Sequence, residues 1–189
     1  MTPTACGGMA TGLEWRYVGF CGFLWGSWVF GPAAVNSDGA RMFYGESMVA
    51  IDDKGRMAMP VMHREALAQL CAGQLMVTYN PFEAQCLLLF PRGEWERIRD
   101  QLAGLKTFER AHREMVRKLV GAAHGVELDG QGRIVLPHSP RQVVGLERRG
   151  VLLGMGSKFE LWTEAAHRAQ MERPIDAADT TEAMRELDI

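Results

Sequence analysis

The sequence has little that marks a general nucleic-acid-binding protein, a membrane protein or a disordered one. Its formal net charge is −2 at pH 7, so any contact with a polyanion must come from a local group of cations. The most apolar stretch, residues 17–30, is shorter than the roughly 20 residues that a bilayer requires, and we expect no membrane partner. With 47% hydrophobic and 23% charged residues, the sequence predicts a folded globular protein.

Motifs for metal binding and catalysis are also missing. The four cysteines lack the C-x-x-C spacing of a zinc site, and the five histidines never form a His-x-x-x-His pair. The sequence has no glycine-rich phosphate loop and no nucleophile elbow around a serine. We therefore predict a protein that is not an enzyme and that uses no metal, no cofactor and no small-molecule substrate.

Two of the cysteines, Cys71 and Cys86, lie in apolar surroundings within the part of the chain that looks folded. We predict that all four cysteines are reduced thiols, as is usual in a cytosol. A disulfide between Cys71 and Cys86 is the alternative.

The first 41 residues differ in composition from the rest of the chain. They hold only two basic and two acidic residues and show neither helical nor strand periodicity. The apolar stretch within them resembles a secretory signal, but too little positive charge precedes it. We expect Met42 to be the natural start, with residues 1–41 read through from upstream, and an unstructured extension is the alternative.

An internal repeat organises the chain from Met42 onward. The segment DDKGRMAMP at residues 52–60 recurs 77 positions later as DGQGRIVLP at residues 129–137, with Asp, Gly, Arg and Pro at the same positions. A short apolar run precedes each segment and another lies within it, so each copy predicts a β-hairpin. About fifty residues bury too little surface to be stable alone, and we therefore expect the hairpin of each half to complete its sheet with the other half.

The residue types in the repeat explain how each turn would form. An aspartate at the start of a turn, Asp52 or Asp129, can accept hydrogen bonds from the backbone amides that follow it. Gly55 and Gly132 can adopt the positive φ that such a turn requires. We interpret these four residues as supports of the turn.

Other elements repeat as well and predict an α+β protein with two tandem βαβ halves. The halves are expected at residues 42–106 and 125–173, joined by a linking helix at 107–124 and followed by a flexible acidic tail at 174–189. Helices are predicted at residues 63–71, 92–102, 139–144 and 164–172, and further strands at 75–79, 85–90, 151–154 and 158–162.

Cations cluster at the predicted turns and suggest contact with double-stranded DNA. An arginine can grip a phosphate or a guanine edge with two hydrogen bonds, and Lys54 adds charge beside Arg56. In the second copy, Arg133 and Gln131 occupy the matching positions. The alternative role of each arginine is a structural ion pair with the aspartate of its own turn. The hypothesis requires Arg56 and Arg133 to face solvent on one side of the subunit.

The repeated D-x-x-x-R element, together with Met-Phe-x-Gly-Glu at residues 42–46, resembles the MraZ family of the AbrB/SpoVT-like superfamily, over residues 42 to about 173. This resemblance implies two AbrB-like halves with swapped hairpins, forming one pseudo-symmetric, double-barrel-like domain. It also implies subunits closed into a ring.

The functional implication of the resemblance is a cytoplasmic, nucleoid-associated transcriptional regulator, expected to be a repressor. Such a protein would bind direct DNA repeats upstream of its own gene, in the division and cell-wall gene cluster. An oligomeric protein-interaction scaffold with little or no DNA binding is the alternative, which the slightly negative net charge favours.

Overall fold

The computed structural model describes residues 42–105, 108–176 and 179–187. The expectations for residues 1–41 therefore lie outside the described residues. All the elements below belong to one compact unit of the chain. No helix among the described residues is long and apolar enough to cross a membrane.

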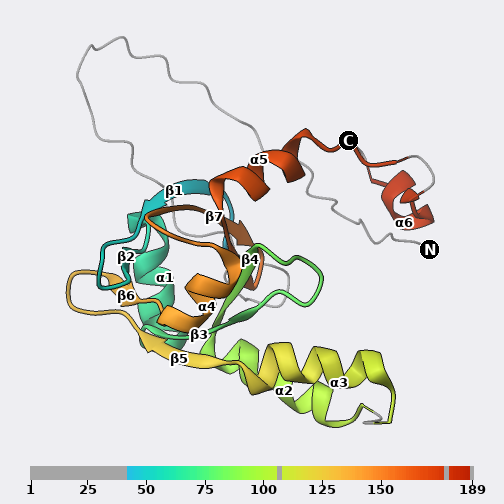
Figure 1. Cartoon of the computed structure of the whole chain (residues 1–189), viewed down its shortest axis with the longest axis horizontal. Coiled ribbons are helices and arrows are strands. Elements are labelled where there is room, and N and C mark those ends of the chain that lie inside the picture. Colours follow the sequence, from blue (N-terminus) through green and yellow to red (C-terminus); the bar gives the residue numbers. More distant parts are fainter. Residues whose placement is uncertain (1–41, 106–107, 177–178, 188–189) are drawn as a thin grey trace, which may run out of the picture. The chain divides into compact units, whose positions relative to one another are not determined.

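The first half of the described chain has two strands and a helix, followed by two more strands and a helix, and the second half repeats this order (Figure 1). The first half contains β1 (Glu46–Ala50), β2 (Arg56–Ala58), α1 (Val61–Cys71), β3 (Gln74–Tyr79), β4 (Cys86–Pro91) and α2 (Arg92–Ala103). A helical segment follows, consisting of α3 (Arg110–Val116) and the π-helical turn η1 (Arg117–Gly121). The second half contains β5 (His124–Glu127), β6 (Arg133–Val135), α4 (His138–Val144), β7 (Arg149–Met155), β8 (Lys158–Trp162) and α5 (Glu164–Glu172), with a short α6 (Glu182–Arg185) after it.

Most of the predicted elements are confirmed to within two residues. The strand at 158–162 and the helix at 164–172 have the predicted bounds. The linking segment differs from the prediction, because the α-helix begins at Arg110, gives way to a π-helical turn at Arg117 and ends before His124, which already belongs to β5. Another short helix, α6, lies in the stretch predicted as a flexible tail.

The strands form one sheet of six and one ribbon of two, and all neighbouring strands are antiparallel. The large sheet has the order β1-β7-β8-β4-β3-β5, and the ribbon pairs β2 with β6. By position in the repeat, β1 corresponds to β5, β3 to β7 and β4 to β8. If each strand is exchanged with its counterpart, the same order results when it is read from the opposite edge of the sheet. The internal repeat of the sequence therefore appears as an approximate two-fold symmetry of the strand order.

The strands that flank each repeated turn pair mainly with strands of the other half. β1 pairs with β7, β5 pairs with β3, and β2 pairs with β6. Within the first predicted hairpin, the ladder is reduced to the bridge between Ile51 and Met57. The turn thus forms where the sequence predicts it, but its strands separate because they complete the sheet and the ribbon of the partner half.

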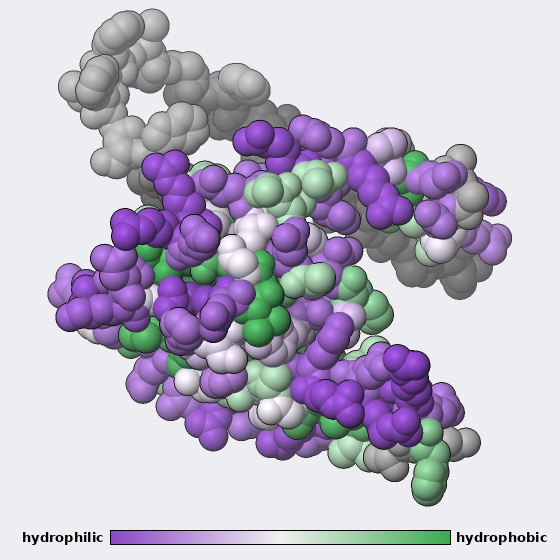
Figure 2. All heavy atoms as spheres, in the orientation of Figure 1, coloured by the Kyte–Doolittle hydropathy of each residue, from purple (hydrophilic) through white to green (hydrophobic). Residues whose placement is uncertain are grey.

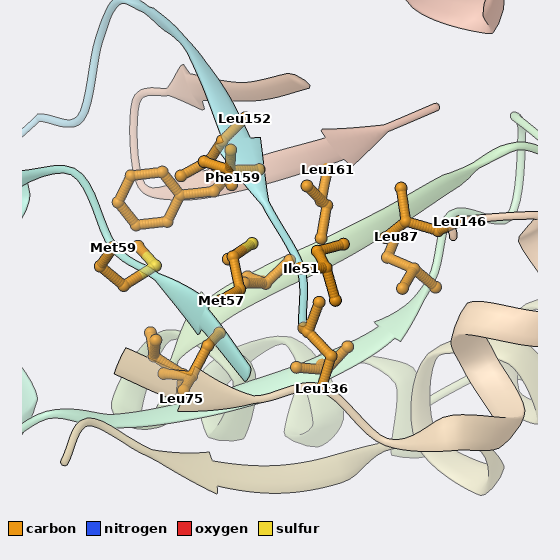
Figure 3. Close-up of a cluster of buried hydrophobic side chains, with 14 of the residues drawn as sticks. Ile51, Met57, Met59, Leu75, Leu87, Leu136, Leu146, Leu152, Phe159 and Leu161 are labelled. Carbon is orange, nitrogen blue, oxygen red and sulfur yellow. The ribbon is translucent and has the colours of Figure 1, made fainter. Parts of the chain in front are cut away.

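The main core lies between the inner face of the sheet and the β2–β6 ribbon. Met57 of β2 and Ile134 of β6 are fully buried and lie opposite each other in the ribbon. Figure 3 shows Met57 and Leu75 of the first half pointing into the same cluster as Leu136 of the second half. Because neighbouring residues of a strand face opposite sides, burial of Met57 and Ile134 turns Arg56 and Arg133 outward.

A second, smaller core covers the outer face of the sheet. It contains Phe90 and Trp162 of the central strands and Leu119 of η1. Cys86 belongs to this cluster, and burial raises the pKa of its thiol to about 12. Cys71 and Cys86 are both free, which confirms the prediction of reduced thiols at these two positions.

The packing of the β2–β6 ribbon predicts different costs for two adjacent substitutions. Ile134→Ala removes a fully buried side chain shared by both halves and should lower the free energy of unfolding by about 2–5 kcal/mol. Val135→Ala is the matched control, because Val135 is 56% exposed and the change should stay within about 0.5 kcal/mol. Chemical denaturation at equal protein concentration measures both values. Equal effects would show that the ribbon does not face the core as described.

Candidate functional site

The first repeated turn is built around the carboxylate of Asp52. Its Oδ1 accepts hydrogen bonds from the backbone amides of Lys54, at 2.9 Å, and Arg56, at 2.8 Å. Its Oδ2 accepts a hydrogen bond from Nε of Arg56 at 2.6 Å. One carboxylate therefore fixes both the backbone of the turn and the direction of the arginine side chain.

The second turn repeats this network residue by residue. Oδ1 of Asp129 accepts from the backbone amides of Gln131, at 2.8 Å, and Arg133, at 2.9 Å. Oδ2 of Asp129 accepts from Nε of Arg133 at 2.9 Å. The same residue types at the same spacing thus give the same local structure twice.

Both turns also depend on a glycine in the left-handed region. The φ angle is +79° at Gly55 and +71° at Gly132, values that residues with a side chain rarely adopt. The amide of each glycine donates to the carbonyl oxygen of the aspartate that begins the turn, at 2.9 Å and 2.8 Å. These two glycines and the two aspartates occupy the positions that the sequence assigned to them as supports of the turn.

Arg56 and Arg133 emerge from these turns on one exposed face of the β2–β6 ribbon. In the register of the ribbon, Arg56 lies opposite Val135 and Arg133 lies opposite Ala58, so all four residues share the face away from the core. The side chains of Arg56 and Arg133 are each 39% exposed. Neither arginine points inward and the two are not on opposite sides, so the structure meets the requirement set by the DNA-binding hypothesis.

Lys54 and Gln131 lie at matching positions near the tips of the two turns, and both are exposed. The first turn holds Lys54 where the second holds a neutral glutamine, but it also holds Asp53 where the second holds Gly130, so the two turns have the same net charge. Arg148 adds a further cation there, in an exposed ion pair of 2.9 Å with Asp53. Figure 2 shows hydrophilic residues gathered over the region of the two turns. The site is therefore a local polar and cationic surface on a chain of slightly negative net charge.

Sequence reasoning missed two arginines that lie beside the turns. Arg64 on α1 follows Pro60 by four residues, and Arg141 on α4 follows Pro137 by the same number. Nε of Arg64 donates to the carbonyl of Met59 at 2.8 Å. The 77-residue spacing of the repeat relates the two arginines, and extending the repeat past the prolines would have found them.

A pocket of about 440 Å³ lies between α1 and the second turn. Arg64, Ala68, Ala72 and Gly73 line one side, and residues 128–132 line the other. Among the described residues, no group of three or more histidine, cysteine, aspartate or glutamate side chains could hold a metal ion. The polar groups that line this pocket thus come from Arg64 and from the second turn.

The arginines of the linking helix form a different surface. Arg110 is paired with Glu114 on the same helix, at 2.8 Å, and its side chain is 86% exposed. An ion pair between residues four apart on an exposed helix is typical of a solvated helix face.

The hydrogen bonds at the turns shift the pKa of both aspartates in the same direction. Bonds from the backbone amide and then the side chain of Arg56 hold the pKa of Asp52 below its ordinary value of 3.8. The backbone amide and side chain of Arg133 do the same for the pKa of Asp129. A carboxyl group with a lowered pKa supports the fold above its ordinary pKa, and this support is lost as the pH falls through the lowered value.

The two glycines of the second turn should respond differently to the same substitution. Gly132→Ala places a Cβ at positive φ and 2.5 Å from Nε of Arg64, so it should cost about 1–3 kcal/mol of unfolding free energy. Gly130→Ala is the control, because a Cβ there meets open space and the change should stay within about 0.5 kcal/mol. Thermal or chemical unfolding gives both values. A tolerated Gly132→Ala together with a damaging Gly130→Ala would contradict the described turn.

The titration of Asp52 tests the hydrogen-bond network directly. We expect NMR titration of the full chain to give a midpoint below 3.8 for its carboxyl group, because the ionised form accepts the bonds. Arg56→Gln removes the side-chain bond but keeps the backbone bond, which is the larger cause, so the midpoint should rise and still remain below 3.8. A midpoint at or above 3.8 in the unaltered chain would refute the network.

Comparison with known proteins places this repeated geometry in a family. The model of the MraZ protein family, described as antitoxin-like, matches residues 42–118 and again residues 119–188. The transcriptional regulator MraZ of Stenotrophomonas maltophilia is 47% identical over 146 residues, which cover 77% of this chain and 99% of that protein. The proteins of the same name from Xylella fastidiosa and Xanthomonas campestris are 46% and 45% identical, with the same coverage of each chain.

The two matched segments of the family model each contain one of the aspartate-arginine turns. The duplication seen in the sequence and in the strand order is therefore also the duplication that the family model recognises. Because that model covers more than half of the chain, and relatives at 45–47% identity cover more than two thirds of it, the chain belongs to the MraZ family.

Proposed function

We propose that this protein is a transcriptional regulator that binds double-stranded DNA through its two aspartate-arginine turns. The observation that carries the proposal is the placement of Arg56 and Arg133 on one exposed face of the β2–β6 ribbon. Relatives that carry the name transcriptional regulator MraZ support the regulatory role. The regulator is active in the cytoplasm, in association with the nucleoid.

The aspartates help DNA binding although they carry negative charge. Asp52 already accepts bonds from two backbone amides and from Nε of Arg56, so its charge is largely engaged within the turn. The side chain of Arg56 remains 39% exposed, and its guanidinium has further N–H donors for an acceptor in the DNA. The aspartate thus orients the arginine, and the arginine makes the contact.

The two turns offer two kinds of contact with DNA, contacts to phosphates and contacts to base edges. Lys54 and the two arginines supply positive charge for phosphate oxygens, which position a protein on the duplex. Gln131 at the tip of the second turn carries an amide that can hydrogen-bond adenine in the major groove. Binding through such contacts should weaken as salt concentration rises, because phosphate contacts release counterions.

The pairing of strands between halves supports the swapped-hairpin arrangement of an AbrB-like domain. β1 lies on β7 and β5 lies on β3, so each half contributes its first strand to the sheet of the other. The β2–β6 ribbon then holds the two turns in one pseudo-symmetric domain of double-barrel type. This arrangement fixes the spacing of Arg56 and Arg133 and makes them a single binding surface.

Association of several subunits would turn weak individual contacts into strong binding. A ring of subunits could meet direct repeats about one helical turn apart, so each further contact would be intramolecular. Exposed apolar side chains such as Val61 on α1, 76% exposed, and Val143 on α4, 68% exposed, are available for contacts between subunits. The target sites are direct repeats upstream of the protein's own gene, in the division and cell-wall cluster, and binding there represses transcription.

Arginine substitutions in the two turns test this function. Arg56→Ala or Arg133→Ala should abolish specific binding to DNA from upstream of the protein's own gene, measured by mobility shift, while size-exclusion chromatography shows an unchanged assembly. Arg110→Ala is the matched control, because Arg110 is an exposed arginine that pairs with Glu114 away from the turns, and it should bind like the unaltered chain.

The same assay separates DNA binding from a role as a protein-interaction scaffold. If the unaltered chain fails to bind this DNA, or if Arg56→Ala and Arg110→Ala bind equally well, the turns are not a DNA-binding surface. Affinity that does not fall with rising salt would also contradict the proposal, since it would exclude contacts with phosphate.

A further inference from the structure

Each aspartate-arginine turn is in contact with an arginine from the helix of the other half. Arg64 lies on α1 of the first half, against Gly132 in the second turn. Arg141 lies on α4 of the second half, against Gly55 in the first turn. The two arginines are 77 residues apart, the same spacing that relates the turns, so the contact is made twice by equivalent residues.

The contact between Arg64 and the second turn is close. A Cβ atom on Gly132 would lie 2.5 Å from Nε and 2.6 Å from Cδ of Arg64, so the backbone of the turn rests directly on this side chain. Nε of Arg64 also donates to the carbonyl of Met59 at 2.8 Å, and the amide of Met59 donates to the carbonyl of Gly132 at 3.0 Å. Arg64 is thus tied to the turn by packing and through one intervening residue, Met59.

The first turn has the same arrangement with one bond fewer. A Cβ on Gly55 would lie 3.0 Å from Nη2 of Arg141 and 2.8 Å from the carbonyl oxygen of Leu136, and the amide of Leu136 donates to Gly55 at 2.8 Å. Nε of Arg141 is buried and has no hydrogen-bond partner among the described residues. This nitrogen therefore adds no bond equivalent to the one that Arg64 makes.

We propose that Arg64 and Arg141 are positioning residues for the DNA-contacting turns, each holding the turn of the opposite half. The inference rests on the proposed function for its consequence in DNA binding. Gly132 directly precedes Arg133, so the side chain beneath Gly132 sets the backbone direction from which Arg133 extends. A guanidinium suits this position because it is flat, can pack against a peptide plane and keeps a fixed donor geometry.

Hydrogen–deuterium exchange of the full chain without DNA tests the cross-half contact. Arg64→Ala should speed exchange in residues 129–133 about tenfold and leave residues 52–56 unchanged, and Arg141→Ala should give the reverse pattern. A general loss of structure would instead affect both turns together. Equal changes in both turns, a change only in the turn of the same half, or no change would overturn the inference.

DNA binding supplies the second readout, with DNA from upstream of the protein's own gene as the probe. Arg64→Lys keeps the charge but loses the bond to Met59 and the flat packing surface, so affinity should fall about tenfold. Arg141→Lys loses no such bond, so its affinity for the DNA should fall less than that of Arg64→Lys. The slope of affinity against salt should stay that of the unaltered chain for both variants, whereas loss of a phosphate contact lowers it by about one.

The two measurements distinguish the possible failures. If the unaltered chain does not bind the DNA, the proposed function fails, and the exchange pattern still decides whether Arg64 and Arg141 hold the opposite turns. If Arg64→Lys binds normally, or if its salt slope falls by about one, Arg64 is not a positioning residue.

Discussion

The structure depends on one local interaction. An aspartate carboxylate accepts hydrogen bonds from two backbone amides and from the side chain of the arginine four residues later. Asp52 and Asp129 make this interaction in the same way, and in both turns the hydrogen bonds from the arginine hold the pKa of the carboxyl group below its ordinary value. The interaction needs a glycine at positive φ and an arginine at the next position. These demands account for the D-x-x-G-R pattern in both copies of the repeat.

The two turns face the same side of the protein because a strand of each half pairs with a strand of the other half. β2 and β6 form a ribbon whose inner residues, Met57 and Ile134, are fully buried in a core built from both halves. Burial of these two residues fixes the outward face of the ribbon and brings Arg56 and Arg133 onto it. A slightly acidic chain can in this way present a compact group of cations, because the fold concentrates charges that are dispersed in the sequence.

The sequence predicted those features that follow from local chemistry. Asp-x-x-Gly-Arg specifies its own turn, and alternating or helical periodicity located strands and helices such as 158–162 and 164–172. Partners of the strands could not be read locally, since β1 has the same pattern whether it pairs with β2 or with β7. The π-helical turn at Arg117 and the contact of Arg64 with Gly132 also depend on packing between segments distant in the chain.

The central claim is that both turns face the DNA as one surface, and site-specific photo-crosslinking tests it most directly. A photoreactive amino acid is placed at Lys54, at Gln131 or, as a control, at Arg110, and each protein is irradiated in complex with the upstream DNA. The account predicts crosslinks from positions 54 and 131 and none from position 110. Crosslinks from position 110 alone, or from only one of the two turns, would contradict it.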